Sequence, residues 1–168
     1  MTDKGRRDVT YIAVVGAGDP HPDTDGAAFE VGRALGERGA VLVCGGMTGV
    51  MEAACRGAKA AGGTTVGILP TSHRRHANPF VDIAIATGMG EMRNALIVRA
   101  VDAVIAVGGE FGTLSEIALA LKIGVPVVGL QTWGLTKATG PVDAIATADS
   151  ADDAVERALE AASRVRDC

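Results

Sequence analysis

Short, unbroken runs of apolar residues alternate along this chain with longer stretches of helical periodicity. The runs predict strands at Tyr11–Val15, Val41–Cys44, Thr64–Leu69, Val81–Ala86, Ala103–Val107 and Val125–Leu130. Runs that are apolar at every position, rather than at every second one, are typical of a parallel sheet covered on both faces. Helices are predicted between the strands, at about Asp25–Arg38, Gly49–Ala61, Glu91–Ala100, Thr113–Lys122 and Asp152–Arg164.

This alternation predicts an α/β fold, a Rossmann-like doubly wound parallel sheet with right-handed crossovers. A length of 168 residues fits a single domain, so we expect one domain over residues 1–168 with a flexible segment at residues 1–8. A hydrophobic content of 48% excludes a disordered chain. An apolar patch at Val142–Ala146 predicts either a further short strand or a loop.

Charge and hydropathy exclude two classes of partner, and the formal net charge is -4. Nucleic-acid binders usually carry a basic field, so we expect no nucleic-acid partner. No apolar stretch reaches the roughly 18–20 residues of a membrane span, so we expect no membrane partner. Basic residues precede Tyr11–Val15, but no cleavage site follows that run, which is therefore interpreted as a first strand.

The cysteines also limit the chemistry. The chain has three, Cys44, Cys55 and Cys168, and no C-x-x-C pair. This spacing supports neither a disulfide framework nor a structural zinc site, so no metal ligands are assigned and a cytoplasmic location is expected.

Three glycine-rich turns follow predicted strands and supply the candidate ligand-binding residues. These residues are Gly16 and Gly18, then Gly45, Gly46, Thr48 and Gly49, then Gly108, Gly109, Glu110, Phe111, Gly112 and Thr113. The carboxyl ends of parallel strands share one edge, where ligands bind, and the last two turns lead into helix N-termini that favour an anion. The turns therefore predict a site for a small phosphorylated molecule. The alternative is that the glycines only permit tight strand-to-helix turns.

Familiar nucleotide-binding fingerprints do not fit. The third glycine of G-x-G-x-x-G is replaced by His21, and no acidic residue follows Cys44-Gly45 to bind a ribose. The P-loop pattern is absent as well. A standard NAD site and a P-loop NTPase are both excluded at this level.

Arg93 and Glu116 are the charged candidates. Arg93, at the start of its predicted helix, either grips a phosphate in the crevice or is a solvated helix-end arginine. Glu116 lies three residues after Thr113. That spacing fits a capping box, with Thr113 as the helix cap, or a carboxylate that orients a water or a ribose hydroxyl.

Two other segments suggest contacts. The helix from Met92 to Val101 is apolar around most of its circumference, which predicts burial on several sides and a subunit interface, most simply in a homodimer. The basic run from His73 to His76 is either a flap over an anionic ligand or a solvated loop.

Four stretches of the chain resemble a known superfamily. They are Cys44-Gly-Gly-Met-Thr-Gly-Val-Met-Glu52, Ala77-Asn-Pro-Phe80, Thr87-Gly-Met-Gly-Glu-Met-Arg-Asn94 and Gly108-Gly-Glu-Phe-Gly-Thr-Leu-Ser-Glu116. The superfamily was once labelled "possible lysine decarboxylase" and includes the LONELY GUY (LOG) phosphoribohydrolases and the molybdenum cofactor carrier proteins. The resemblance implies a Rossmann-like fold and a homodimer or homotetramer. No pattern here supports the pyridoxal lysine of a decarboxylase.

Within that superfamily the chain resembles the carrier branch more. The LOG enzymes carry Pro-Gly-Gly-x-Gly-Thr-x-x-Glu, often with two adjacent glutamates, and a lysine after the arginine. Arg93, Gly112, Thr113 and Glu116 match that pattern. It is broken at the proline, at the second glycine, at the first glutamate and at the lysine, where this chain has Gly108, Glu110, Ser115 and Asn94.

The resemblance implies two competing functions. As a carrier or storage protein, the chain would bind molybdenum cofactor, a phosphorylated pterin, and would need no cofactor of its own. As a phosphoribohydrolase, it would cleave the N-glycosidic bond of a nucleoside 5′-monophosphate, with Arg93 and Glu116 as catalytic residues. A third reading is a nucleotide sensor that uses the same pocket without catalysis.

Overall fold

Seven parallel strands form the sheet at the centre of the protein, in the order β4-β3-β2-β1-β5-β6-β9. A computed structural model describes residues 9–166, so the predicted flexibility of residues 1–8 lies outside the described residues. The strands span Tyr11–Gly16 (β1), Val41–Cys44 (β2), Thr64–Leu69 (β3), Ile83–Ala86 (β4), Ala103–Val107 (β5), Val127–Leu130 (β6) and Ala146–Thr147 (β9). The predicted α/β class and the doubly wound parallel sheet are confirmed.

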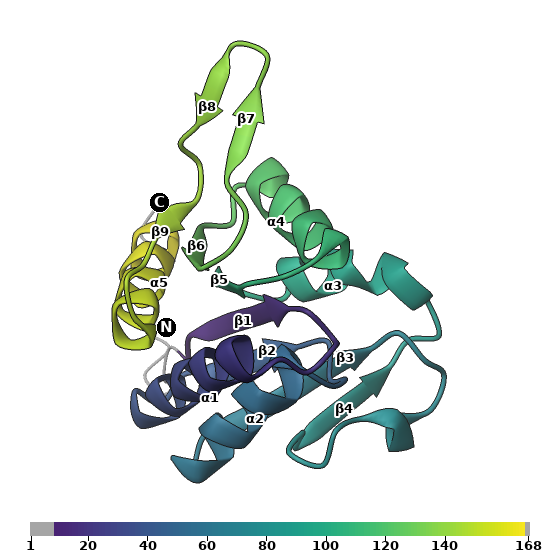
Figure 1. Ribbon diagram of the computed structural model, residues 1–168. Helices are drawn as coiled ribbons and strands as arrows, with labels where there is room; N and C mark the ends of the chain where they lie inside the picture. The colour runs from purple at the N-terminus through teal and green to yellow at the C-terminus, as the bar shows by residue number, and fades with distance from the viewer. Residues whose placement is uncertain (1–8, 167–168) are drawn as a thin grey trace, which may run out of the picture.

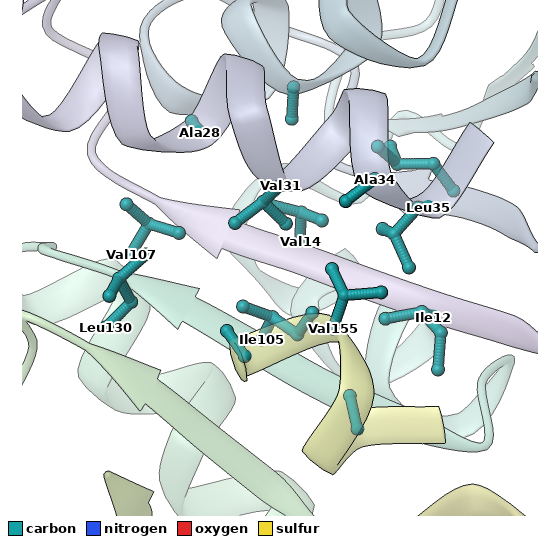
Figure 2. Packing of buried hydrophobic residues seen from close by; sticks show 14 of the residues in the cluster. Ile12, Val14, Ala28, Val31, Ala34, Leu35, Ile105, Val107, Leu130 and Val155 are labelled. Carbon is teal, nitrogen blue, oxygen red and sulfur yellow. The ribbon is translucent and has the colours of Figure 1, made fainter. Parts of the chain in front are cut away.

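Helices cover both faces of the sheet (Figure 1). One face carries α1 (Pro22–Glu37), α2 (Val50–Ala60) and α5 (Ala151–Arg166), and the other carries α3 (Asn94–Arg99) and α4 (Phe111–Ile123). Alternate residues of β1 point to the two cores: Ile12 and Val14 to the first, Ala13 and Val15 to the second. Figure 2 shows Val14 beneath Val31 and Ala34 of α1. This two-sided burial is the reason that the strands are apolar at every position.

Close packing of α1 on α2 uses glycine at the contact. A Cβ atom at Gly32 would lie 1.9 Å from the carbonyl oxygen of Ala54, and one at Gly57 would lie 1.9 Å from that of Phe29. No side chain fits at either position, so the two helix backbones touch directly. The high glycine content therefore serves helix packing as well as turns.

The order of the strands places a crevice between β1 and β5. The chain leaves β1 toward α1 on one face of the sheet, and leaves β5 toward α4 on the other face. Neighbouring strands whose connections diverge in this way open a gap at their carboxyl ends, where open α/β sheets bind ligands. The first and third glycine turns flank this gap.

Two features differ from the sequence-based expectation. The segment expected to be one helix from Glu91 to Ala100 is a 3-10 turn, η2 (Gly90–Arg93), followed by the short α3. The patch at Val142–Ala146 is divided between β8 (Gly140–Val142) and β9, and β8 pairs with the unexpected β7 (Leu135–Lys137). The β7–β8 hairpin projects away from the sheet (Figure 1).

None of the described helices is long and apolar enough to cross a membrane.

Candidate functional site

A hollow of about 220 Å³ lies at the carboxyl ends of β1 and β5. Its walls come from segments far apart in the sequence: the ends of β1 and β2, the residue after β3, η2 and the start of α4. The lining residues are Val14, Val15, Gly16, Ala17, Gly18, Gly45, Met51, Pro70, Glu91, Arg93, Asn94, Glu110, Gly112, Thr113 and Glu116. The hollow lies at the edge of the sheet where the sequence predicts a ligand site.

The predicted binding residues divide into two groups. Gly16, Gly18, Gly45, Glu110, Gly112, Thr113, Arg93 and Glu116 line the hollow. Gly46, Thr48, Gly49, Gly108, Gly109 and Phe111 are not among the lining residues. Thr48 instead donates a hydrogen bond through Oγ1 to the carbonyl oxygen of Gly18 (2.7 Å), which ties the second turn to the first. Phe111 is 77% exposed and its ring packs against that of Trp133, with centroids 5.6 Å apart.

The third turn leads directly into α4. The helix begins at Phe111, and its first backbone bond runs from the Leu114 N–H to the Glu110 carbonyl oxygen (3.0 Å). The N–H groups of Gly112 and Thr113 precede that bond, so they remain available to an anion at the helix N-terminus. The capping-box alternative is wrong, because Glu110 occupies the N-cap position and Thr113 is the third helical residue.

The side chain of Arg93 is buried at the hollow. Its side chain is 8% exposed, its Nε has no hydrogen-bond partner, and no ion pair within 4 Å joins it to another described residue. A Cβ atom at Gly45 would lie 2.2 Å from Nη1, so glycine there makes room for the guanidinium. Burial lowers the pKa of Arg93, and the charges of Glu116 and Cys44 offset only part of that effect. A buried, unpaired cation of this kind calls for an anionic ligand.

Glu116 lies one turn inside α4 and is also buried, at 7% exposure. Burial raises the pKa of its carboxyl to about 7, and the nearby charge of Arg93 opposes that shift. At neutral pH the group is thus divided between its acid and its carboxylate. A carboxyl with a pKa near neutrality is suited to give or take a proton.

Sequence reasoning missed several lining residues. Glu91 and Asn94 flank Arg93 on η2 and α3, Met51 lies in the first turn of α2, and Pro70 directly follows β3. Asn94 Nδ2 donates to Ser115 Oγ (3.0 Å), which in turn donates to the Gly112 carbonyl oxygen (2.6 Å), so α3 is braced against the start of α4. Glu91 and Asn94 could have been predicted as lining residues from their closeness in sequence to Arg93.

The apolar helix and the basic run have different outcomes. Along η2 and α3, here called the α3 segment, Ile97 and Val98 are buried, but Met92 is 75% exposed and Leu96 also reaches the surface, so the predicted burial on several sides is only partial in the single chain. The basic run contains η1 (Arg74–His76), and its side chains are exposed. His73, Arg74 and Arg75 border a separate hollow beside β4, and no residue of the run lines the pocket described above.

Among residues 9–166, no group of three or more His, Cys, Asp or Glu side chains is arranged to hold a metal ion. The polar groups that line the hollow are the Arg93 guanidinium, the N–H groups at the start of α4, the Asn94 amide, the Thr113 hydroxyl and the carboxyl groups of Glu91, Glu110 and Glu116.

Comparison with known proteins agrees with this architecture. A cytokinin riboside 5′-monophosphate phosphoribohydrolase of Mycobacterium tuberculosis is 35% identical over 133 residues, which are 73% of this chain and 71% of that protein. The structure of a molybdenum cofactor binding protein from Rippkaea orientalis superposes with a TM-score of 0.82 at 35% identity, covering 92% of this chain and 98% of that one. The Moco carrier protein of Chlamydomonas reinhardtii superposes with a TM-score of 0.80 at 32% identity, covering 93% and 99% of the two chains.

These similarities match the resemblance that the sequence motifs indicated. A family model also matches residues 9–162, which is nearly the whole of the described chain. This chain belongs to the SLOG cluster4 family.

Proposed function

We propose that the protein binds a phosphorylated pterin or nucleotide at this hollow, and that it serves as a carrier or storage protein for molybdenum cofactor. The observation that carries the proposal is Arg93, a buried cation that forms no ion pair with a described residue and lies at the same hollow as the N-terminus of α4. A phosphate there would accept hydrogen bonds from the guanidinium and from the N–H groups of Gly112 and Thr113.

The size of the hollow fits the phosphate end of such a ligand. Pockets that enclose whole drug-sized molecules are usually about 300–1,000 Å³, which is larger than the 220 Å³ found here. The ring system of the ligand would therefore extend over the rim. Titration calorimetry of the purified protein with molybdopterin tests the proposal. Saturable binding in wild type that is lost in Arg93→Gln and kept in Arg99→Gln supports it, whereas no binding by the folded wild-type protein refutes it.

A second function is favoured by Glu116. A carboxyl group with a pKa of about 7 beside a buried arginine can stabilise the oxocarbenium-like state of N-glycosidic cleavage or activate the attacking water. The 35% identical phosphoribohydrolase of M. tuberculosis points the same way. Incubation with AMP or N6-isopentenyl-AMP, followed by chromatography of the free base, tests this function.

The variants assign the role within that assay. Glu116→Gln should lower the rate by about 10²-fold or more if Glu116 acts in acid–base chemistry. Glu156→Gln, an exposed position on α5, serves as the control. An equal rate in wild type and Glu116→Gln would remove Glu116 from catalysis, and no release of base by the wild type leaves the carrier function as the proposal.

We further propose that the protein is a homodimer through the exposed apolar face of β4 and the α3 segment. On this face Ile83, Ile85, Met92 and Leu96 are exposed, although a parallel sheet normally has both faces covered. Glu91 and Arg99 lie at opposite ends of the same segment, so a two-fold partner running antiparallel would pair unlike charges.

Light scattering after gel filtration should give a dimer for wild type and for Val165→Asp, and a monomer for Met92→Asp. A monomeric wild type would refute the interface.

A further inference from the structure

Two cysteine side chains meet beneath the second glycine turn. Cys44 ends β2 and Cys55 lies on α2, and their sulfur atoms are 3.5 Å apart in the core. Both side chains are fully buried. The proposed binding function makes no use of either thiol, so the contact is open to a chemistry of its own.

We propose that Cys44 and Cys55 form a reversible disulfide on exposure to hydrogen peroxide, and that this disulfide weakens anion binding in the neighbouring pocket. The first half of the proposal stands on the contact between the thiols, and the second half rests on the proposed function. Intracellular disulfides of this kind are usually transient and redox-sensing.

The surroundings distinguish the two sulfurs. The Gly46 N–H donates a hydrogen bond to Cys44 Sγ (3.2 Å). The contact with Cys55 lowers the pKa of Cys44, and the Gly46 N–H and the charge of Arg93 act in the same direction, whereas burial opposes them. That contact and burial raise the pKa of Cys55. Cys44 is therefore the nucleophile and Cys55 the resolving thiol.

The reaction balances with peroxide as the only oxidant. The Cys44 thiolate attacks one peroxide oxygen, so an S–O bond forms as the O–O bond breaks, and hydroxide leaves and takes up a proton to become water. The Cys55 sulfur then attacks the Cys44 sulfur, and the S–O bond breaks as the hydroxyl leaves as water with the proton from Cys55. Two thiols lose two electrons, and one peroxide becomes two waters.

Formation of the disulfide would affect the pocket through the glycine turn that follows Cys44. Sulfurs now 3.5 Å apart must approach to about 2.05 Å. The residues after Cys44 are held on several sides: the Asn78 N–H donates to the Gly46 carbonyl oxygen (2.8 Å), and Asn78 Nδ2 donates to that of Met47 (2.9 Å). Gly45 packs against the Arg93 guanidinium with no space for a Cβ atom. A shift of Cys44 therefore displaces Gly45 and disturbs the cation that binds the ligand.

Mass spectrometry tests the disulfide without any ligand. The full chain carrying Cys168→Ser is reduced, exposed to hydrogen peroxide, denatured with an alkylating agent and digested. We expect a cross-linked peptide that joins Cys44 to Cys55 and that disappears on treatment with dithiothreitol. Full alkylation of both cysteines after peroxide, or a sulfinic acid at Cys44 with Cys55 free, overturns the proposal.

Two variants in the same background test the order of attack. Cys55→Ser should accumulate sulfenic or sulfinic acid at Cys44, because no resolving thiol is present. Cys44→Ser should leave Cys55 reduced under the same exposure. Oxidation of Cys55 in Cys44→Ser at the rate seen with both thiols present would overturn the assigned order.

Titration with AMP tests the coupling. We expect the oxidised protein to bind AMP about tenfold more weakly than the reduced protein, within the usual range of coupling between sites. Dithiothreitol should restore the affinity, and Cys55→Ala, which cannot form the bond, should show no tenfold loss. An oxidised protein with unchanged affinity overturns the coupling. A reduced protein that does not bind AMP counts against both the coupling and nucleotide binding, while the disulfide is judged by mass alone.

Discussion

Asp82 and Arg93 are charged side chains at opposite edges of the sheet, and their surroundings differ. Asp82 precedes β4 at the amino-terminal edge of the sheet, where it pairs with Lys59 Nζ (2.8 Å) and accepts a hydrogen bond from the Thr65 N–H (2.9 Å). Arg93 lies at the opposite edge, more deeply buried, with its Nε unpartnered. Asp82 is therefore paired within its own chain, whereas Arg93 forms no ion pair with a described residue.

The difference indicates which charges serve the fold. Asp102 repeats the pattern of Asp82, since it precedes β5 and accepts from the Tyr11 N–H at the start of β1 (2.8 Å). Carboxylates at this edge therefore fasten neighbouring strands at their first residues. A buried charge that fastens nothing in its own chain costs stability unless a ligand compensates it. Stability and binding should thus separate cleanly between the two edges.

The largest effect expected from this contrast is the pH dependence of stability at Glu116. Its folded pKa of about 7 lies above the ordinary glutamate value, so between those two pH values the folded state binds more protons than the unfolded state. Stability from this group is present at low pH and is lost as the pH rises. A shift from 4.5 to about 7 corresponds to about 3 kcal/mol, lost between about pH 4 and pH 8.

Urea denaturation at a series of pH values measures this loss. Wild type and Glu156→Gln should both lose the roughly 3 kcal/mol. Glu116→Gln should lack this component and should be more stable than wild type at pH 8. If the Glu116→Gln profile follows that of wild type, the burial of the carboxyl does not control the stability of this edge.

A smaller effect is expected at Arg93. Arg93→Gln should weaken the binding of AMP by about 10- to 100-fold, because hydrogen bonds to charged groups contribute about 1.5–3 kcal/mol. Its free energy of unfolding should be unchanged or higher, since the variant removes an uncompensated buried charge. Calorimetry and urea denaturation of the same preparation measure both quantities.

Arg99→Gln is the matched control, because Arg99 lies on the same segment but is exposed. It should leave both quantities near the wild-type values. A large loss of stability in Arg93→Gln would contradict the contrast, since Arg93 would then support the fold.

The predictability of the molecule follows the same division. The cores of the strands could be predicted, because residues such as Ile12 to Val15 are buried on both faces and so leave a continuous apolar run in the sequence. The edge that carries the pocket could be predicted from glycines after those runs. The β7–β8 hairpin could not, because its strands have three residues each and project from the core, so no burial pattern marks them.

The errors at the site arise from packing between distant segments. Thr113 is a better cap by residue type than Glu110, yet α4 begins earlier, with Thr113 buried and in close contact with Gly109. The exposure of Met92 could not be read from an apolar run, because periodicity does not say which surface a neighbour covers. The burial of Arg93 depends on Gly45, which lies 48 positions earlier in the chain.

The smallest effect is expected at Asp82 and has the opposite signature. Burial would raise the pKa of this carboxyl, but its bonds with Lys59 and Thr65 outweigh that effect and lower it, so its contribution to stability is present at neutral pH and is lost on acidification. Asp82→Ala should cost about 1–2 kcal/mol at pH 7, a modest value because the pair is partly solvated. Asp82→Asn should cost less, since its amide oxygen can still accept from the Thr65 N–H. Both variants should bind AMP as tightly as wild type does. If Asp82→Ala instead weakened binding as much as Arg93→Gln, the two edges would not be independent and the amino-terminal edge would have a role in the site.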